Sequence, residues 1–282
     1  MNSLIWIILD SCRYDSFTAA AKPSVDRFAR YNNTRVERRY TYASWTAPSH
    51  CAFLMGLVPH SSPPGVFASE VYKQDFSHWA HRLGVTGMDF AMFLPHLSLP
   101  KVLGEMGYRT IGRVSLPVIN ETTILSAHFD DYRMMDDHND FKGMVAEMKF
   151  THHQPCFYFL NLGETHYPYM LKDPTLPRLS GVHGAVRWLN REATTRDTIT
   201  PQTTPFFDMP TMARLKQQQV RCVEYFDALL GELFRKCPRE TYIIITADHG
   251  ELFGEDNYFG HGPVIHEKVL EVPFVEGRVP PA

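Results

Sequence analysis

The sequence LIWIILD at residues 4–10 is the segment from which the fold class can be argued. Its apolar run predicts a strand that is buried on both faces, and such strands are typical of parallel sheets covered by helices. The run is too short to span a bilayer. It ends in an acidic residue, Asp10, and α/β proteins place their ligands beyond the carboxyl ends of parallel strands. We therefore expect Asp10 to be a functional residue.

Two further apolar runs have the same character. They occupy residues 156–162 and 241–246, and both predict buried strands. Each run is followed within a few residues by acidic and histidine side chains: Glu164 and His166 after the first run, Asp248 and His249 after the second. If the three strands are neighbours in one sheet, these side chains converge with Asp10 on a single crevice.

The segments between these runs predict helices and additional strands. We expect helices at residues 24–31, 97–107, 143–149 and from an Asp208 N-cap to about 236, and strands at 109–112 and 269–275. Strands that alternate with helices indicate an α/β fold, with a mostly parallel central β-sheet flanked by helices on both faces in three layers. We expect one domain over residues 1–282, with a long irregular excursion at 171–208.

The composition excludes several classes of protein. Hydrophobic residues make up 44% of the 282 residues, which is enough for a large core. The net charge is −3 and no basic run is present, so a nucleic-acid partner is not expected. The five cysteines lack a Cys-x-x-Cys pair and predict neither a disulfide framework nor a zinc knuckle. Thiols without a recognisable export signal or membrane span predict a cytoplasmic location.

The polar residues at the strand ends predict a metal site. Two carboxylates and an imidazole, from Asp10, Asp248 and His249, suit a divalent cation. A hydroxyl group on that cation, such as that of Thr46 in the segment SWTAPSH at 44–50, would become a nucleophile at neutral pH. Each residue also has a structural alternative when taken singly. Asp10 is compatible with a turn or cap, Thr46 or Ser49 with a helix N-cap, and His166 with a surface loop.

Six segments together resemble the alkaline-phosphatase/sulfatase superfamily, in its sulfatase-like branch with a Thr nucleophile. In chain order they are LDSCRYD at 9–15, TAPSHCAFLMG at 46–56, residues 97–110, GETHYPY at 163–169, TADHGE at 246–251 and GHG at 260–262. The Thr-x-Pro-Ser and Asp-His-Gly motifs are the specific parts of this resemblance. It implies an alkaline-phosphatase-like fold and an enzyme that acts on ester bonds.

The resemblance also implies a role for each matching residue. It assigns the metal to Asp10, Thr46, Asp248 and His249, and makes Thr46 the nucleophile that forms a covalent intermediate. His166 and His261 would contact the non-bridging oxygens or protonate the leaving group. His50, Ser49 and Glu164 are the expected substrate-binding residues. The cofactor would be one divalent ion (Mn, Mg, Ca or Zn), with a second metal on Glu164, His166 and His261 as an alternative.

Several departures from the family pattern guide the choice of reaction. True sulfatases carry Cys or Ser at the nucleophile position and mature it to formylglycine, whereas Thr46 cannot mature in that way. His50 replaces the motif's Arg, His261 replaces a closing Lys, and Ser11 follows Asp10 where the family commonly has an acidic residue or a His. The family usually continues into a small C-terminal subdomain, so we expect that subdomain to be truncated here. The active-site wall is then incomplete or completed by another subunit of a homo-oligomer.

The function predicted from the sequence is metal-dependent hydrolysis of phosphate or phosphonate monoesters or diesters through Thr46. Three alternatives stay open: a phosphotransferase that uses an acceptor alcohol, a sulfate ester hydrolase, and a catalytically inactive relative that binds a ligand. Aromatic residues beside the site, Trp45, Tyr167 and Tyr169, could exclude water and favour transfer. The expected partner is a small-molecule phosphate or sulfate ester.

Overall fold

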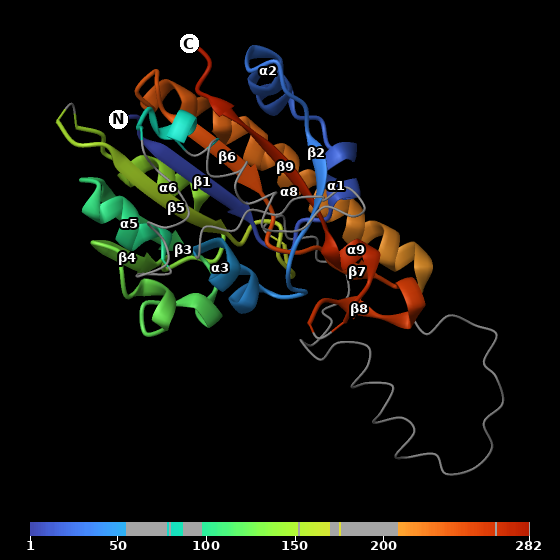
Figure 1. The fold of residues 1–282 in the computed structure, drawn as a ribbon. Coiled ribbons are helices and arrows are strands. Elements are labelled where there is room, and N and C mark those ends of the chain that lie inside the picture. Colours follow the sequence, from blue (N-terminus) through green and yellow to red (C-terminus); the bar gives the residue numbers. More distant parts are fainter. Residues whose placement is uncertain are drawn as a thin grey trace, which may run out of the picture.

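The computed structural model describes residues 1–54, 78, 80–86, 98–151, 153–169, 175, 208–262 and 264–281. Within these ranges a seven-stranded sheet forms the centre of the molecule (Figure 1). In order across the sheet, the strands are β2 (Glu37–Tyr40), β9 (Glu271–Arg278), β6 (Tyr242–Thr246), β1 (Leu4–Leu9), β5 (Cys156–Leu162), β3 (Arg109–Val114) and β4 (Asp131–Met134).

The sheet is mostly parallel, as predicted. The central strand β1 pairs in parallel with β5 on one side and β6 on the other, so that Ile7 lies opposite both Leu160 and Ile245. Only β9 runs antiparallel to its neighbours, β6 and β2. Every residue of β1 is fully buried, as its continuous apolar sequence requires.

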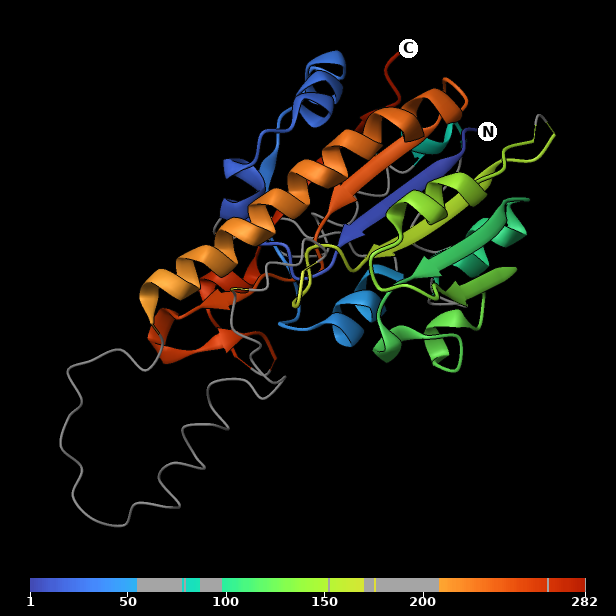
Figure 2. The ribbon, with the colours of Figure 1, turned by 180° about the vertical axis from the view of Figure 1, so that it is seen from behind.

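Helices cover both faces of the sheet, which gives the three predicted layers (Figures 1 and 2). One face carries α1 (Tyr14–Ala19), α2 (Pro23–Tyr31), α6 (Phe141–Glu147) and α8 (Met209–Lys236); the other carries α3 (Thr46–Leu54) and α5 (Leu99–Glu105). Side chains of β1 alternate between the two layers. Ile7 belongs to the core cluster that contains Phe226 of α8, whereas Trp6 packs with Phe53 of α3.

Most of the predicted elements are present with nearly the predicted bounds. The Asp208 side chain accepts a hydrogen bond from the Thr211 N–H and caps α8, as expected. The last strand begins at Glu271, two residues later than expected, and it is antiparallel. Strands β2 and β4 were not predicted, because both lie at sheet edges and carry charged residues. The excursion expected at 171–208 lies outside the described residues except at its end and at Thr175.

Smaller elements lie outside the central sheet, among them 3-10 helices at Pro117–Ile119, Ile124–Ser126 and Glu255–Asn257. A two-stranded ribbon, β7 (Leu252–Phe253) and β8 (Phe259–Gly260), follows β6, and α9 (Glu267–Leu270) precedes β9. Among the described helices, none combines the length and hydropathy needed to cross a membrane.

Candidate active site

The structure brings together Asp10, Asp248 and His249 at the carboxyl ends of β1 and β6. One ligand atom from each lies within 4.8 Å of the others, and this is the one such group of at least three His, Cys, Asp or Glu residues among the described ranges. All three side chains are fully buried. Nε2 of His249 is 3.8 Å from Oδ1 of Asp10 and 3.3 Å from Oδ2 of Asp248. The parallel pairing of β1 and β6 therefore assembles the group that the sequence predicted.

Thr46 lies beside this group at the first position of α3. Its Oγ1 is 3.3 Å from Nε2 of His249, and the side chain is almost completely buried. The hydroxyl group therefore points at the same small volume as the two carboxylates.

The imidazole of His249 is held in the tautomer that a metal ligand needs. Its Nδ1–H donates to the Gly250 carbonyl oxygen over 2.9 Å, so Nε2 carries a lone pair. Burial lowers its pKa well below the usual value, and the charge of His261 adds to this effect. Gly250 allows the tight packing here, because a Cβ at this position would lie 2.1 Å from the carbonyl oxygen of Lys268.

The two buried carboxyl groups compete for negative charge. Burial raises the pKa of Asp10, but the neighbouring His166, His249 and other groups outweigh burial and lower it to about 2. Burial and the charge of Asp10 raise the pKa of Asp248 well above the usual value. A bound dication would remove this repulsion.

An unpaired oxygen supports a cation at this position. Oδ1 of Asp248 accepts hydrogen bonds from the N–H groups of Ser11 (3.1 Å) and His249 (3.0 Å), whereas Oδ2 is buried without a hydrogen bond. This Oδ2 faces the Nε2 lone pair of His249, so two acceptors point at each other. Buried acceptors in this arrangement require a positive partner. The residues therefore fit a divalent cation.

The two predicted histidines lie next to the group. The ring centroid of His261 is 4.3 Å from that of His249 and 5.2 Å from that of His166. Nδ1 of His166 donates to the carbonyl oxygen of Tyr167 over 2.6 Å, which leaves Nε2 as the ring atom available to a ligand. Burial alone would lower the pKa of His261, but Glu251 outweighs burial and raises it.

Glu251 is a site residue that the sequence interpretation missed. Its Oε1 is 3.5 Å from Nδ1 of His261, and its Oε2 accepts the Tyr169 hydroxyl hydrogen over 2.6 Å. The carboxylate is almost completely buried. Its position directly after the Asp-His-Gly segment was the available signal, although nothing local indicated its partners.

Ser49 and His50, which were expected to bind substrate, are both bonded to the backbone in this structure. The Ser49 hydroxyl donates to the backbone carbonyl of Asp248 over 2.8 Å. The His50 ring donates from Nδ1 to the Thr46 carbonyl over 2.8 Å, and its edge contacts the rings of Phe53 and Phe159. Both side chains are buried, and they hold the start of α3 against the end of β6.

Glu164 also turns away from the position expected for it. Its Oε1 accepts the N–H of Phe141 over 2.7 Å and so caps the start of α6, and burial raises its pKa to about 7. Within the described residues, Glu164 forms no candidate metal group with His166 and His261. The predicted second-metal group is therefore not assembled.

Comparison with known proteins identifies the family. A family model described as Sulfatase matches residues 2–275. A search of curated proteins finds no match. Among solved structures, the C-terminal periplasmic domain of EcEptC from Escherichia coli in complex with Zn has a TM-score of 0.59 at 13% identity, covering 99% of this chain and 73% of that one.

Two other solved structures share the fold. The C-terminal periplasmic domain of phosphoethanolamine transferase EptC from Campylobacter jejuni has a TM-score of 0.54 at 11% identity, covering 98% of this chain and 79% of that one. Streptococcus pyogenes phosphoglycerol transferase GacH, in complex with sn-glycerol-1-phosphate, has a TM-score of 0.50 at 11% identity, covering 98% of this chain and 68% of that one.

The expected cytoplasmic location is contradicted by these comparisons, because similar structures include C-terminal periplasmic domains of phosphoethanolamine transferases. The absence of a recognisable export signal was therefore a wrong basis for that prediction. The family match covers nearly the whole chain and includes each residue of the buried Asp10, Asp248 and His249 group. The chain belongs to the sulfatase family.

Proposed function

We propose that the chain is a metal-dependent enzyme that cleaves phosphate or phosphonate esters through a covalent intermediate on Thr46. The observation that carries this proposal is the position of Thr46 Oγ1, 3.3 Å from Nε2 of His249 in the buried group with Asp10 and Asp248. A divalent cation held by these four residues would supply positive charge that lowers the pKa of the Thr46 hydroxyl and polarises an ester oxygen.

The reaction proceeds in two displacements at phosphorus. Thr46 loses its hydroxyl proton to solvent, and Oγ1 attacks phosphorus as the bond to the leaving alcohol breaks. A water oxygen then attacks the phosphorylated Thr46, and the bond between phosphorus and Oγ1 breaks. This releases phosphate, or the phosphonate or monoester that corresponds to the substrate, and regenerates Thr46.

His261 is the proposed proton donor for the first displacement. Glu251 raises its pKa, which favours the protonated ring that can pass a proton to the oxygen of the leaving alcohol. In the second displacement the neutral ring accepts a proton from the attacking water. His166, with Nδ1 bound to the Tyr167 carbonyl, is the proposed contact for a non-bridging oxygen through Nε2.

The identity of the nucleophile favours phosphorus over sulfur chemistry. Formylglycine cannot form from threonine, so sulfate hydrolysis would lack the nucleophile used by sulfatases. The ligand types admit Mn, Mg, Ca or Zn. Zinc gains support from the zinc complex of the E. coli structure, which shares this fold.

Transfer to an acceptor alcohol is a second candidate function. The fold is shared with a phosphoethanolamine transferase and a phosphoglycerol transferase, and the second displacement differs only in the attacking oxygen. Aromatic rings also lie beside His166. Tyr167 contacts Tyr169 and Phe259, with ring centroids 5.7 and 5.4 Å apart. Tyr169 and Phe259 are buried in this cluster and Tyr167 is partly exposed, so Tyr167 is the ring that could exclude water in favour of an organic acceptor.

One experiment tests the proposed reaction and its nucleophile together. Metal-stripped protein is assayed on nitrophenyl phosphate, diester, phosphonate and sulfate, with each cation added back. We expect metal-dependent cleavage of a phosphorus ester that falls roughly 10³-fold or more in Thr46→Ala. Thr18→Ala, which changes an exposed threonine in α1, is the matched control. Full activity of Thr46→Ala would overturn the proposal.

Product analysis separates hydrolysis from transfer. Glycerol or ethanolamine is added to the active mixture, and the phosphorylated products are measured. Transfer gives a new phosphate ester at the expense of free phosphate, whereas a hydrolase gives the same free phosphate with and without the alcohol.

A further inference from the structure

Gln219 is a buried polar residue in the part of α8 that passes the active-site loops. Its side chain is completely inaccessible to solvent, although most buried neighbours on this helix are apolar. Figure 2 shows α8 running along the sheet and past the carboxyl ends of β1 and β6. A buried amide needs hydrogen-bond partners, and the identity of those partners indicates what the residue does.

The Gln219 amide binds the backbone of two separate segments. Its Nε2 donates to the carbonyl oxygen of Ser11 over 2.9 Å and to that of Thr165 over 3.1 Å. Its Oε1 accepts the N–H of Arg13 over 3.3 Å. One side chain therefore joins the turn after β1 to the loop after β5.

The segment after β1 supports the candidate metal group directly. Ser11 has a φ of 59°, in the left-handed region that non-glycine residues rarely adopt. In this conformation its N–H donates to Asp248 Oδ1 and its hydroxyl donates to Asp10 Oδ1. Gln219 binds the Ser11 carbonyl and the Arg13 N–H, which flank Cys12 directly after Ser11, and so holds this turn in place.

The segment after β5 carries His166. The residue before it, Thr165, donates from its hydroxyl to the backbone carbonyl of Asp10 over 2.7 Å, and its own carbonyl accepts from Gln219. The loop is thus tied both to β1 and to α8. Of these two hydrogen bonds of Thr165, the one from its hydroxyl to Asp10 would remain without Gln219.

We propose that Gln219 is a positioning residue that fixes His166 relative to Asp10 and Asp248. This inference rests on the proposed function, in which His166 contacts an ester oxygen. Displacement of a reacting group by about 1 Å can reduce turnover by roughly 10²-fold, so a clamp on this loop acts on kcat. We expect the cation to keep its ligands when Gln219 is changed, because the hydrogen bonds from Ser11 to Asp10 and Asp248 do not involve Gln219.

Three variants test the proposal. Gln219→Met keeps the side-chain length and removes all three hydrogen bonds, whereas Gln219→Glu keeps the acceptor for Arg13 and places an oxygen against two carbonyl oxygens. Gln217→Met changes an exposed glutamine on the same helix and is the matched control. For each protein we would measure kcat and KM with the best nitrophenyl ester, and Mn²⁺ or Zn²⁺ stoichiometry and affinity by equilibrium dialysis.

Hydrogen exchange gives a readout that does not depend on activity. The N–H groups of His166 and Tyr169 donate to the carbonyl oxygens of Gly163 and His166, and their exchange reports on the order of the loop. We expect both Gln219 variants to lower kcat by about 10² with KM changed by less than about threefold. We also expect faster exchange at these two groups, with one metal bound per chain. Gln217→Met should match the wild type.

Failure of the Gln219 proposal and failure of the proposed function give different results. Wild-type kcat and unchanged loop exchange in Gln219→Met would overturn the proposal, and so would a loss of activity that merely follows a loss of bound metal. If the wild type cleaves no ester, the proposed function fails. The exchange data then decide alone: faster exchange limited to the loop supports the clamp, and exchange identical to that of Gln217→Met overturns it.

Discussion

Oε1 of Glu251 lies 3.5 Å from Nδ1 of His261, and this carboxylate orients the imidazole beside the candidate metal group and raises its pKa. The second carboxylate oxygen accepts from the Tyr169 hydroxyl, so Glu251 itself is fixed. A histidine oriented by a buried carboxylate is a common arrangement in proton-transfer sites.

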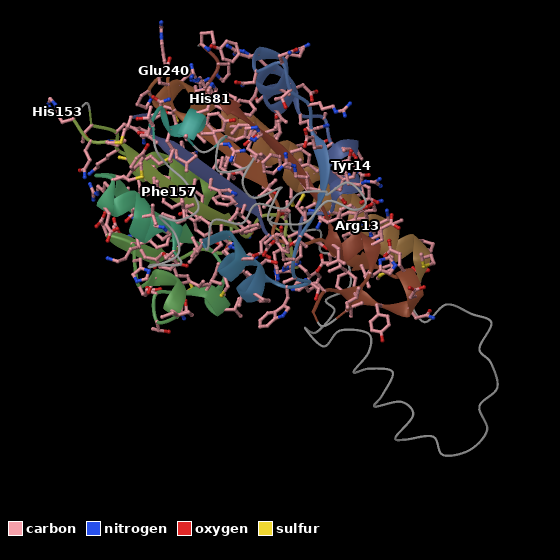
Figure 3. The ribbon with its side chains drawn as sticks, in the orientation of Figure 1. Arg13, Tyr14, His81, His153, Phe157 and Glu240 are labelled. Carbon is pink, nitrogen blue, oxygen red and sulfur yellow. The ribbon has the colours of Figure 1, made fainter. Side chains whose placement is uncertain are left out.

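Removing the charge of Glu251 is expected to change the pH profile. Glu251 raises the pKa of His261, so Glu251→Gln lowers it. If protonated His261 is the donor, activity falls as pH rises through this pKa, and the alkaline limb of the kcat profile moves to lower pH in the variant. The control is Glu240→Gln, at an exposed glutamate. Figure 3 labels Glu240 well away from Arg13, whose guanidinium donates to the Glu251 carbonyl oxygen. Superimposable profiles would rule out this role for Glu251.

The Tyr169 hydroxyl is expected to stabilise the fold through Glu251. Tyr169→Phe keeps the buried ring and removes the donor, which leaves Glu251 Oε2 without that hydrogen bond. Loss of a partner for a buried charged group costs about 1–3 kcal/mol. Urea unfolding should show this loss of unfolding free energy, and Tyr31→Phe, at an exposed tyrosine, should show almost none.

Cation binding is expected to stabilise the protein, and Asp248 is the residue on which to measure it. A cation at 100 times its Kd adds about 2.7 kcal/mol to the unfolding free energy if it binds only the folded chain. Asp248→Asn should abolish that gain. The same variant should be at least as stable as the wild type without cation, because it removes the repulsion that raises the pKa of Asp248. Equal cation-induced shifts in Tm for both proteins would contradict the proposed ligand set.

Glu164 is expected to make stability depend on pH. Its pKa is raised by burial from 4.5 to about 7, so the folded state binds more protons than the unfolded state between these values. The contribution of Glu164 to the unfolding free energy is therefore largest below about pH 4.5. It falls as pH rises through about 7, by roughly 3 kcal/mol in total.

Glu164→Gln isolates this contribution. The glutamine oxygen can still accept the Phe141 N–H. The unfolding free energy of the variant should therefore no longer fall as pH rises from 4.5 to 7, and above pH 7 it should exceed that of the wild type. Thermal unfolding of both proteins from pH 4.5 to 8 measures the difference. Parallel curves would show that Glu164 titrates normally in the fold.

The sequence predicted the centre of the sheet better than its edges. Residues 4–9 and 156–162 are uniformly apolar because both of their faces are covered, and this signal is local. β2 has the sequence ERRY and alternates between half-buried and exposed positions, so its membership of the sheet depends on pairing with β9. A short charged segment carries no comparable local signal.

The same distinction applies to the site. Asp10, Asp248 and His249 could be predicted because each directly follows a recognisable strand, and Thr46 because of its motif. His50 stands four residues after Thr46, one helical turn along α3, and the orientation of that helix against Phe159 decides where its ring points. Gln219 and Glu251 act through partners distant in sequence, which no local pattern reports.

The position of β1 in the sheet has a consequence for biosynthesis. Among the strands of this sheet the ribosome makes β1 earliest, yet its two hydrogen-bonding neighbours begin only at Cys156 and Tyr242. At about 5–20 residues per second, the nascent chain carries an unpaired apolar strand for roughly 7 to 30 seconds before β5 is made. Exposed strand edges recruit other chains. The topology therefore leaves residues 4–9 in need of protection from other chains until β5 has been made.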